Sequence, residues 1–159
     1  MTPPRNLIAN MYWYIRALLE NNGFRAADYT VLYAYPSTVQ IEQYPTVAID
    51  RSTVRKDFFQ LSGPDITKVS LVIDVLGNSR DQKEDISSVL QDYFHERALA
   101  LYDFSSLFPT TVGDYTGIPS LGQFYVDSVS VVTLHPPQFS NVPAEKFHDM
   151  IIMDVSLPS

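Results

Sequence analysis

Apolar residues recur at helical spacing close to the start of the chain and predict an amphipathic helix there. The stripe comprises Leu7, Ile8, Met11, Ile15, Leu18 and Leu19. Thr2 is a suitable N-cap with Pro3 at the first helical position, and the Asn22-Gly23 pair supplies a left-handed stop. The aromatic run at 12–14 is spread around the helix, so at least one ring lies off the stripe. That ring either flanks the core or contacts another subunit.

Extended segments are predicted between the first helix and the middle of the chain. Residues 29–50 are rich in β-branched and aromatic residues, and within them Thr46–Asp50 reads as the best strand and Thr38–Tyr44 as a possible short one. The mixed-charge segment Arg51–Leu61 then leads to a Gly63-Pro64-Asp65 turn. We therefore expect a hairpin with an exposed tip.

The strongest strand signal is followed directly by a second helix. Val69–Leu76 fills one face with apolar residues and part of the other, which predicts an interior strand. Ser79 and Gln82 fit a capping box, and the helix is expected to run to Ala98. Its inner stripe would consist of Ile86, Val89, Leu90, Tyr93, Phe94 and Arg97.

The last third of the chain alternates strands with long connections. Strands are expected at Ala98–Phe104, Gln123–Leu134 and Phe147–Leu157, and loops at 105–122 and 135–146. Loops of this length are uncommon in compact domains unless they have a role. The order of elements predicts an α+β fold with a single mixed, largely antiparallel sheet flanked by two main helices.

Composition narrows the classes of protein to consider. The 159 residues suit one domain spanning 1–159, and 45% hydrophobic with 13% aromatic residues argues against disorder. A net charge of −7 argues against a protein that binds nucleic acid by neutralising phosphates. The chain has no cysteine, which removes disulfides and thiolate chemistry. Neither a leader peptide nor a long apolar run is visible, so we expect a soluble protein made in the cytoplasm.

Catalytic motifs are absent from the sequence. It contains neither a phosphate-binding glycine loop nor a Gly-x-Ser-x-Gly elbow, and its three histidines form no zinc-binding spacing. We expect His95 beside the inner stripe of the second helix, His135 at a strand end and His148 on the outer face of the last strand. No cofactor or metal is therefore predicted.

Two groups of carboxylates are candidate sites. Asp81, Glu84 and Asp85 lie in the first turns of the second helix, where the helix dipole favours anions on a solvated face, although a cation is an alternative. Asp74 is flanked by apolar residues in the interior strand. It either faces outward or pairs with a basic residue, for which Arg51, Arg55 and Lys68 are the candidates. A catalytic or metal-binding Asp74 is the minority interpretation.

One basic cluster stands out as an interface candidate. Arg51, Arg55 and Lys56 are bracketed by acidic residues, and Phe58 and Phe59 follow them. The local charge is too weak for nucleic acid, so pairing with acidic surface on this chain or a neighbour is expected. In a strand the two phenylalanine rings point to opposite sides, so one is available for contact.

The order of these elements resembles the tail terminator (tail completion) proteins of tailed bacteriophages. Tyr44–Asp50 (Tyr-Pro-Thr-Val-Ala-Ile-Asp) fits their Pro-x-Val-x-Ile-Asp strand. The apolar strand Val69–Leu76 then opens the polar helix Asp81–Ala98, which is followed by Leu101–Phe104 (Leu-Tyr-Asp-Phe). The resemblance covers about residues 5–105 and, more loosely, the final hairpin.

What the resemblance implies is a structural virion protein without enzymatic activity or cofactor. Tail terminators form a ring, most often a hexamer, on the finished tail tube. The ring stops tube polymerisation and contacts the tube protein below and the head or neck connector above, while DNA passes through the lumen without specific binding. The hairpin Arg51–Leu61 and the loops 105–122 and 135–146 are then expected to contact neighbouring subunits or the tube.

Other functions remain open at this point. Another neck or tail component, such as a head–tail adaptor or a tube protein, is compatible with the same fold class. A small metal-dependent hydrolase that uses Asp74 and the carboxylates of the second helix is an alternative from another class. A generic cytosolic binding module is the third.

Overall fold

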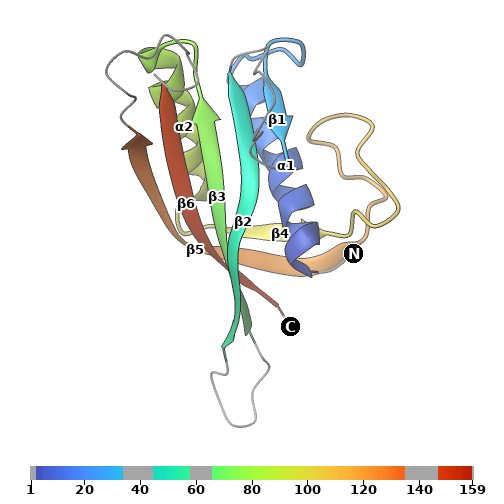
Figure 1. The fold of residues 1–159 in the computed structure, drawn as a ribbon. Helices are drawn as coiled ribbons and strands as arrows, with labels where there is room; N and C mark the ends of the chain where they lie inside the picture. Colours follow the sequence, from blue (N-terminus) through green and yellow to red (C-terminus); the bar gives the residue numbers. More distant parts are fainter. Residues whose placement is uncertain (1–2, 34–44, 58–65, 135–146, 159) are drawn as a thin grey trace.

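A computed structural model places two helices on one six-stranded sheet (Figure 1). It describes residues 3–33, 45–57, 66–134 and 147–158, and for 51–57 the backbone alone. The elements are α1 (Pro3–Asn21), β1 (Thr30–Leu32), β2 (Thr46–Asp57), β3 (Ile66–Leu76), α2 (Arg80–Phe94), β4 (Ala98–Tyr102), β5 (Ser120–Leu134) and β6 (His148–Leu157). The strand order is β1-β2-β3-β6-β5-β4. β1 pairs with β2 in parallel, and the other neighbours are antiparallel.

The amphipathic pattern of the first segment is confirmed by α1. Leu7, Met11 and Ile15 are fully buried, and Leu18 and Leu19 are nearly so. The helix ends at Asn21, and Gly23 adopts φ +92°, the left-handed conformation that closes a helix at little cost for glycine. Thr2, the expected N-cap, lies outside the described residues.

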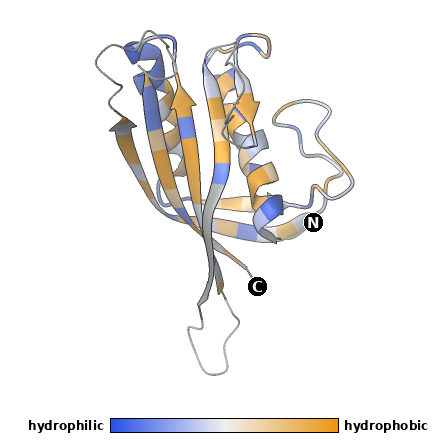
Figure 2. Ribbon diagram, viewed as in Figure 1, coloured by the Kyte–Doolittle hydropathy of each residue, from blue (hydrophilic) through white to orange (hydrophobic). Residues whose placement is uncertain are grey.

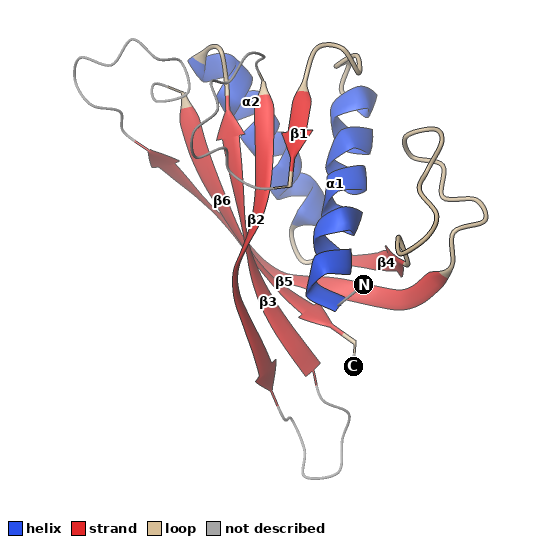
Figure 3. Ribbon diagram, turned by 45° about the vertical axis from the view of Figure 1, so that its right-hand side comes forward, coloured by secondary structure: helices blue, strands red, loops and turns tan. Residues whose placement is uncertain are grey.

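The core lies between the helices and one face of the sheet. Val69, Leu71, Ile73 and Val75 of β3 are at most 1% exposed, as the alternating pattern predicts. The alternate residues of β6 are buried equally deeply: Ile151, Met153, Val155 and Leu157. Hydrophobic residues accordingly mark much of β3 and β6 (Figure 2). Both helices lie on this same side of the sheet (Figure 3).

The predicted hairpin is confirmed, and its strands are longer than the apolar pattern indicated. β2 continues through the charged segment to Asp57, which pairs with Ile66 of β3. A register shift between Arg51 and Thr53 marks an irregularity in the pairing. Backbone pairing with β3, not apolar side chains, extends the strand here. The tip at 58–65 and the possible strand at 38–44 lie outside the described residues.

α2 begins where the capping box predicts and ends earlier than expected. Ser79 Oγ accepts a hydrogen bond from the Gln82 N–H at 3.2 Å, and Gln82 Oε1 accepts one from the Asn78 N–H at 2.7 Å. The helix stops at Phe94, not Ala98, because Glu96 takes φ +47° and turns the chain into β4. The expected inner residue Arg97 therefore lies beyond the helix, and exposed His95 forms its C-cap.

Side chains of α1 cover the outer edge of β4. Asn10 accepts a hydrogen bond from the Tyr102 N–H at 2.8 Å and donates one to the Tyr102 carbonyl at 2.9 Å. Asn6 donates to the same carbonyl at 2.8 Å, and the Tyr14 hydroxyl donates to the Ala100 carbonyl at 2.7 Å. Helix side chains thus replace a neighbouring strand and protect this edge from pairing with other chains.

The remaining boundaries shift by a few residues. β4 ends at Tyr102 instead of Phe104, and β5 begins at Ser120, so the predicted loop at 105–122 becomes 103–119. The predicted connection at 135–146 lies outside the described residues. The chain is an α+β protein with a single mixed, largely antiparallel sheet and two helices, as the sequence predicts.

Candidate functional site

The face of the sheet opposite the two helices carries many of the polar side chains that are described in the sheet. We call it the helix-free face. Its residues alternate with the core residues along four neighbouring strands: Asp50, Lys68, Ser70, Val72, Asp74, Asp127, Ser128, Val132, His148, Met150, Ile152, Asp154 and Ser156. Carboxylates and hydroxyls dominate this set, which places an acidic surface across the middle of the sheet.

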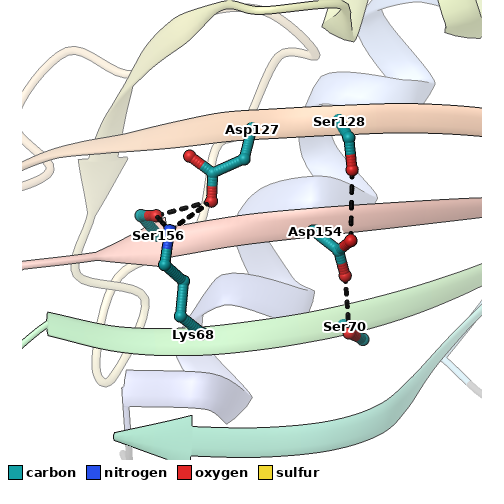
Figure 4. Close-up of polar contacts among 6 residues, drawn as sticks. All are labelled: Lys68, Ser70, Asp127, Ser128, Asp154 and Ser156. Carbon is teal, nitrogen blue, oxygen red and sulfur yellow. Dashed lines mark hydrogen bonds and ion pairs between the residues drawn. The ribbon is translucent and has the colours of Figure 1, made fainter. Parts of the chain in front are cut away.

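A hydrogen-bonded ladder crosses three strands of the helix-free face (Figure 4). Asp154 on β6 accepts hydrogen bonds from the hydroxyls of Ser70 on β3 at 2.6 Å and Ser128 on β5 at 3.1 Å. The strand register places the three residues in one row, Ser70 opposite Asp154 and Asp154 opposite Ser128. Short hydroxyl side chains on both sides fix the carboxylate, and no ion pair of Asp154 is found among the described side chains.

A second row contains the one cation described on this face. Lys68 Nζ lies 2.8 Å from Asp127 Oδ2 and 2.6 Å from Ser156 Oγ, and Ser156 also donates to Asp127 at 2.6 Å (Figure 4). Asp127 sits at the register shift between Val126 and Ser128 of β5. The extra residue there directs the carboxylate toward Lys68, which is a common effect of a β-bulge.

Asp74 pairs with a histidine, which was not among the partners expected from the sequence. His148 Nε2 lies 2.6 Å from Asp74 Oδ1, and both side chains are nearly buried on the helix-free face. The register brings them together diagonally, since Asp74 faces Met150 and Leu76 faces His148. His148 is therefore on the outer face, as predicted, while Lys68 is committed to Asp127.

A buried ion pair lies on the opposite side of the same strand end. Lys83 Nζ of α2 is 3.0 Å from Asp149 Oδ1 of β6, and these side chains are 5% and 3% exposed. The Ser87 hydroxyl donates to the other oxygen of Asp149 at 2.8 Å. Gly77 permits this approach, because a Cβ there would stand 2.9 Å from the Lys83 Cβ. Sequence reasoning missed this pair, although Lys83 and Ser87 fall on the inner stripe of α2.

The sheet separates the two groups of carboxylates that were considered together as a catalytic site. Asp74 lies on the helix-free face, whereas Asp81, Glu84 and Asp85 belong to α2 on the other side. Within residues 3–33, 45–57, 66–134 and 147–158, no three potential metal ligands gather at one point. The arrangement instead ties Asp74 to His148 and Glu84 to Arg80.

The aromatic run of α1 is used inside the molecule. Trp13 and Tyr14 are 9% exposed, and Trp13 packs with Phe104 from the long loop. Arg16 lies over the ring of Trp13, 4.9 Å from its centroid. Tyr115 of the same loop stacks on Tyr102 at 4.5 Å. The flanking-core interpretation of these rings is the one that the structure supports. Four residues of the loop 103–119 join them in a second hydrophobic cluster: Phe104, Val112, Tyr115 and Ile118.

Burial changes the acidity of the tyrosines in this cluster. It raises the pKa of Tyr115 to about 12, with neighbouring tyrosines adding to the effect. It raises the pKa of Tyr14 further, again with nearby tyrosines contributing. Hydrogen bonds from Ser105 lower the pKa of the exposed Asp103 carboxyl, and those from Thr116 lower that of Asp114. These two turns help to fix the conformation of the loop.

The structure describes the backbone of only three of the five interface candidates from the sequence. Arg51, Arg55 and Lys56 lie in β2, opposite Leu71, Lys68 and Thr67 of β3. Phe58 and Phe59 lie outside the described residues. Exposed apolar side chains elsewhere are Tyr33, Leu107, Phe108, Leu121, Tyr125 and Val132. Two of them line a groove of about 460 Å³ beside α1, together with Arg5, Ile8 and Ala9.

Comparison with known proteins does not assign the chain to a family. No protein-family model matches the chain, and no curated protein is similar to it at a significant level. Neither described helix has the length and apolarity needed to cross a membrane.

Proposed function

We propose that this chain is a tail terminator of a tailed bacteriophage, a structural protein of the virion. Several copies close into a ring, expected to be a hexamer, at the end of the tail tube. The ring stops tube polymerisation and joins the tail to the head or neck connector, and DNA passes through its lumen. The basis is the resemblance of the strand, helix and hairpin segments, together with the α+β fold that the resemblance implies.

The observation that carries the proposal is the acidic helix-free face. Asp50, Asp127 and Asp154 lie on it, together with Lys68, which pairs with Asp127, and Arg55, which stands opposite Lys68 in the strand register. Both helices cover the opposite side, so this face is available to line a passage. A negative wall repels the phosphates of DNA, which lets the duplex slide without being held. The serine hydroxyls of the ladder keep the wall polar and flat.

Assembly without the protein is the direct test of this function. Particles made in its absence are expected to carry tails of uncontrolled length or tails not joined to heads. Electron microscopy of negatively stained lysates measures both, and expression of the chain in trans should restore defined tails. Unjoined tails of normal length would instead favour a head–tail adaptor. Complete absence of tubes would favour a tube protein, and normal virions would overturn a role in the tail.

A further inference from the structure

The sheet leaves a long strand edge open on β5. β4 pairs only with the first part of β5, from Ser120 to Tyr125. Residues 128–134 pair with β6 on one side, and no described strand pairs with their other side (Figure 1). The segment 128–134 contains no charge and no proline, the two usual means of blocking an edge. The contrast with β4, whose edge α1 covers, shows that this opening is specific to one part of the sheet.

The opposite end of the sheet is formed by β1. Thr30 donates its N–H to the Pro45 carbonyl on the β2 side at 3.0 Å. Because successive residues of a strand direct their backbone groups to opposite sides, the N–H and C=O of Val31 point away from β2. Tyr33, directly after β1, is 50% exposed, and Val132 on β5 is 41% exposed. Each end of the sheet therefore carries outward backbone groups next to an exposed apolar side chain.

The strand register places these two ends at the same level. Register partners on neighbouring strands form one row across the sheet. From β1 to β5 this row consists of Leu32, Ala48, Asp74, Met150 and Val132. One row of the sheet therefore runs from β1 to the open part of β5. A neighbour related by rotation about an axis parallel to the strands, without translation, brings its own β1 opposite the end of β5. Such a head-to-tail contact closes into a ring if the rotation divides a full turn.

Strand directions are also compatible with this contact. β1, β2 and β6 run one way, and β3 and β5 run the other way. In a ring whose subunits all point the same way, β5 of one copy and β1 of the next are antiparallel. Antiparallel strands form straight, closely spaced hydrogen bonds and are the more stable of the two arrangements. Neither edge brings a charge against the other, since Thr30–Leu32 and Val132–Leu134 are uncharged.

We propose that β5 of one copy pairs with β1 of the next copy, Val132–Leu134 against Thr30–Leu32. The proposal rests on the ring assembly of the proposed function and identifies the joint between its subunits. The helix-free faces then continue from copy to copy as one lining, and Val132 and Tyr33 lie at the covered joint.

Cysteine cross-linking tests the joint directly, because the natural chain contains no cysteine. Leu32 directs its backbone groups toward β2, so Leu32 and Val132 would form a non-hydrogen-bonded pair with their Cβ atoms close together. The variant carrying both Leu32→Cys and Val132→Cys is oxidised at high concentration and analysed on a non-reducing gel. We expect a ladder of covalent oligomers that ends at one closed species. The single variants are expected to give no ladder.

The matched control combines Leu32→Cys with Gln123→Cys. Gln123 is exposed but lies in the part of β5 that β4 covers, opposite Ala100. This pair should remain uncross-linked under the same oxidation. Covalent dimers from Val132→Cys alone would indicate a two-fold β5–β5 contact and overturn the proposal. The proposal would also be overturned if the Leu32→Cys, Val132→Cys variant formed no ladder of covalent oligomers, whether or not electron microscopy shows rings.

The outcomes separate the joint from the function. Rings seen by microscopy without Leu32–Val132 cross-links would reject the joint and leave the tail terminator proposal standing. A cross-linked closed ring in a protein whose loss leaves tails normal would support the joint and reject the function.

Discussion

Lys83 and Asp149 are the least exposed ion pair among the residues that the structure describes. Burying two charges costs several kcal/mol each, and their attraction repays this cost only while both partners and the Ser87 hydrogen bond are present. Arg80 and Glu84 form an ion pair at a similar distance on the surface of the same helix, with side chains 77% and 50% exposed. The two pairs therefore differ mainly in burial.

Lys83→Met is expected to destabilise the fold by about 3–5 kcal/mol, because Asp149 is left buried and unpaired. Adding Asp149→Leu to the same variant should recover most of the loss, since no charge then remains in the core. Urea unfolding followed by circular dichroism measures both. The control Arg80→Met should leave the free energy of unfolding almost unchanged, because its ion pair with Glu84 lies on the surface. A Lys83→Met variant no less stable than this control would contradict the assignment.

The tyrosine hydroxyls of the aromatic cluster differ in their hydrogen bonding. The Tyr14 hydroxyl donates to the Ala100 carbonyl, whereas the buried Tyr115 hydroxyl has no partner within the described part of the chain. Tyr115→Phe is therefore expected to keep or raise the free energy of unfolding, and Tyr14→Phe to lower it by about 1 kcal/mol. Thermal unfolding of the two variants side by side checks this, and a larger loss for Tyr115→Phe would contradict it.

Alkaline pH should weaken the fold through the same tyrosines. An unfolded tyrosine ionises near pH 10, whereas folding raises the pKa of Tyr115 to about 12 and that of Tyr14 as well. Above about pH 10 the unfolded chain therefore binds fewer protons than the folded one, and stability falls as pH rises. Urea unfolding between about pH 9 and 11 measures the slope. Tyr115→Phe should make it shallower, and an unchanged slope would count against burial as the cause.

At the scale of elements, two parts of the same end of the sheet differ in what lies beside them. Asn6, Asn10 and Tyr14 supply hydrogen bonds to the edge of β4, while the later part of β5 has no described strand beside it. A folded chain that protects one edge and leaves another open has a natural place for a second chain.

Asn10→Leu tests the covered edge. The substitution keeps the number and branching of the side-chain heavy atoms, and it removes both hydrogen bonds to Tyr102 and the one to the Asn6 carbonyl. The Tyr102 amide then loses its partner, and a loss of about 1–3 kcal/mol is expected in urea unfolding. Asn22→Ala is the control, because Asn22 is exposed and bonds only the Leu18 carbonyl of its own helix among the described residues. Equal effects of the two substitutions would contradict the role of Asn10.

Local pattern predicted the elements better than their ends. The apolar alternation of Val69–Leu76 and the Ser79 capping box are strong signals, and both are confirmed. The predicted end of α2 at Ala98 is wrong. The helix ends earlier because a non-glycine residue, Glu96, takes the left-handed conformation just after it. The extension of β2 to Asp57 was missed because backbone pairing with β3 sets it, and a charged segment gives no apolar signal.

Contacts between distant strands were beyond sequence reasoning. Asp74 meets His148 because β3 and β6 pair in one register, and a one-residue shift would place them on opposite faces. The Lys83–Asp149 pair depends on the same register. A usable signal did exist, since Lys83 and Ser87 stand among apolar residues on the inner stripe of α2 and a buried lysine requires a partner.

At the scale of the whole molecule, the two faces of the sheet carry different kinds of side chain. The face under the helices holds the core, and the helix-free face carries Asp50, Asp127 and Asp154. In the proposed ring the first face makes each copy rigid and the second lines the passage. The proposed role of these carboxylates is to repel the phosphates of DNA as it passes.

Ring formation is the central claim. Negative-stain electron microscopy of the purified chain at high concentration, alone and mixed with tail tubes, tests it most directly. The account predicts rings of about six copies, free or seated at tube ends, with a central hole wide enough for duplex DNA. A chain that stays monomeric in both samples, with tubes left uncapped, would contradict it.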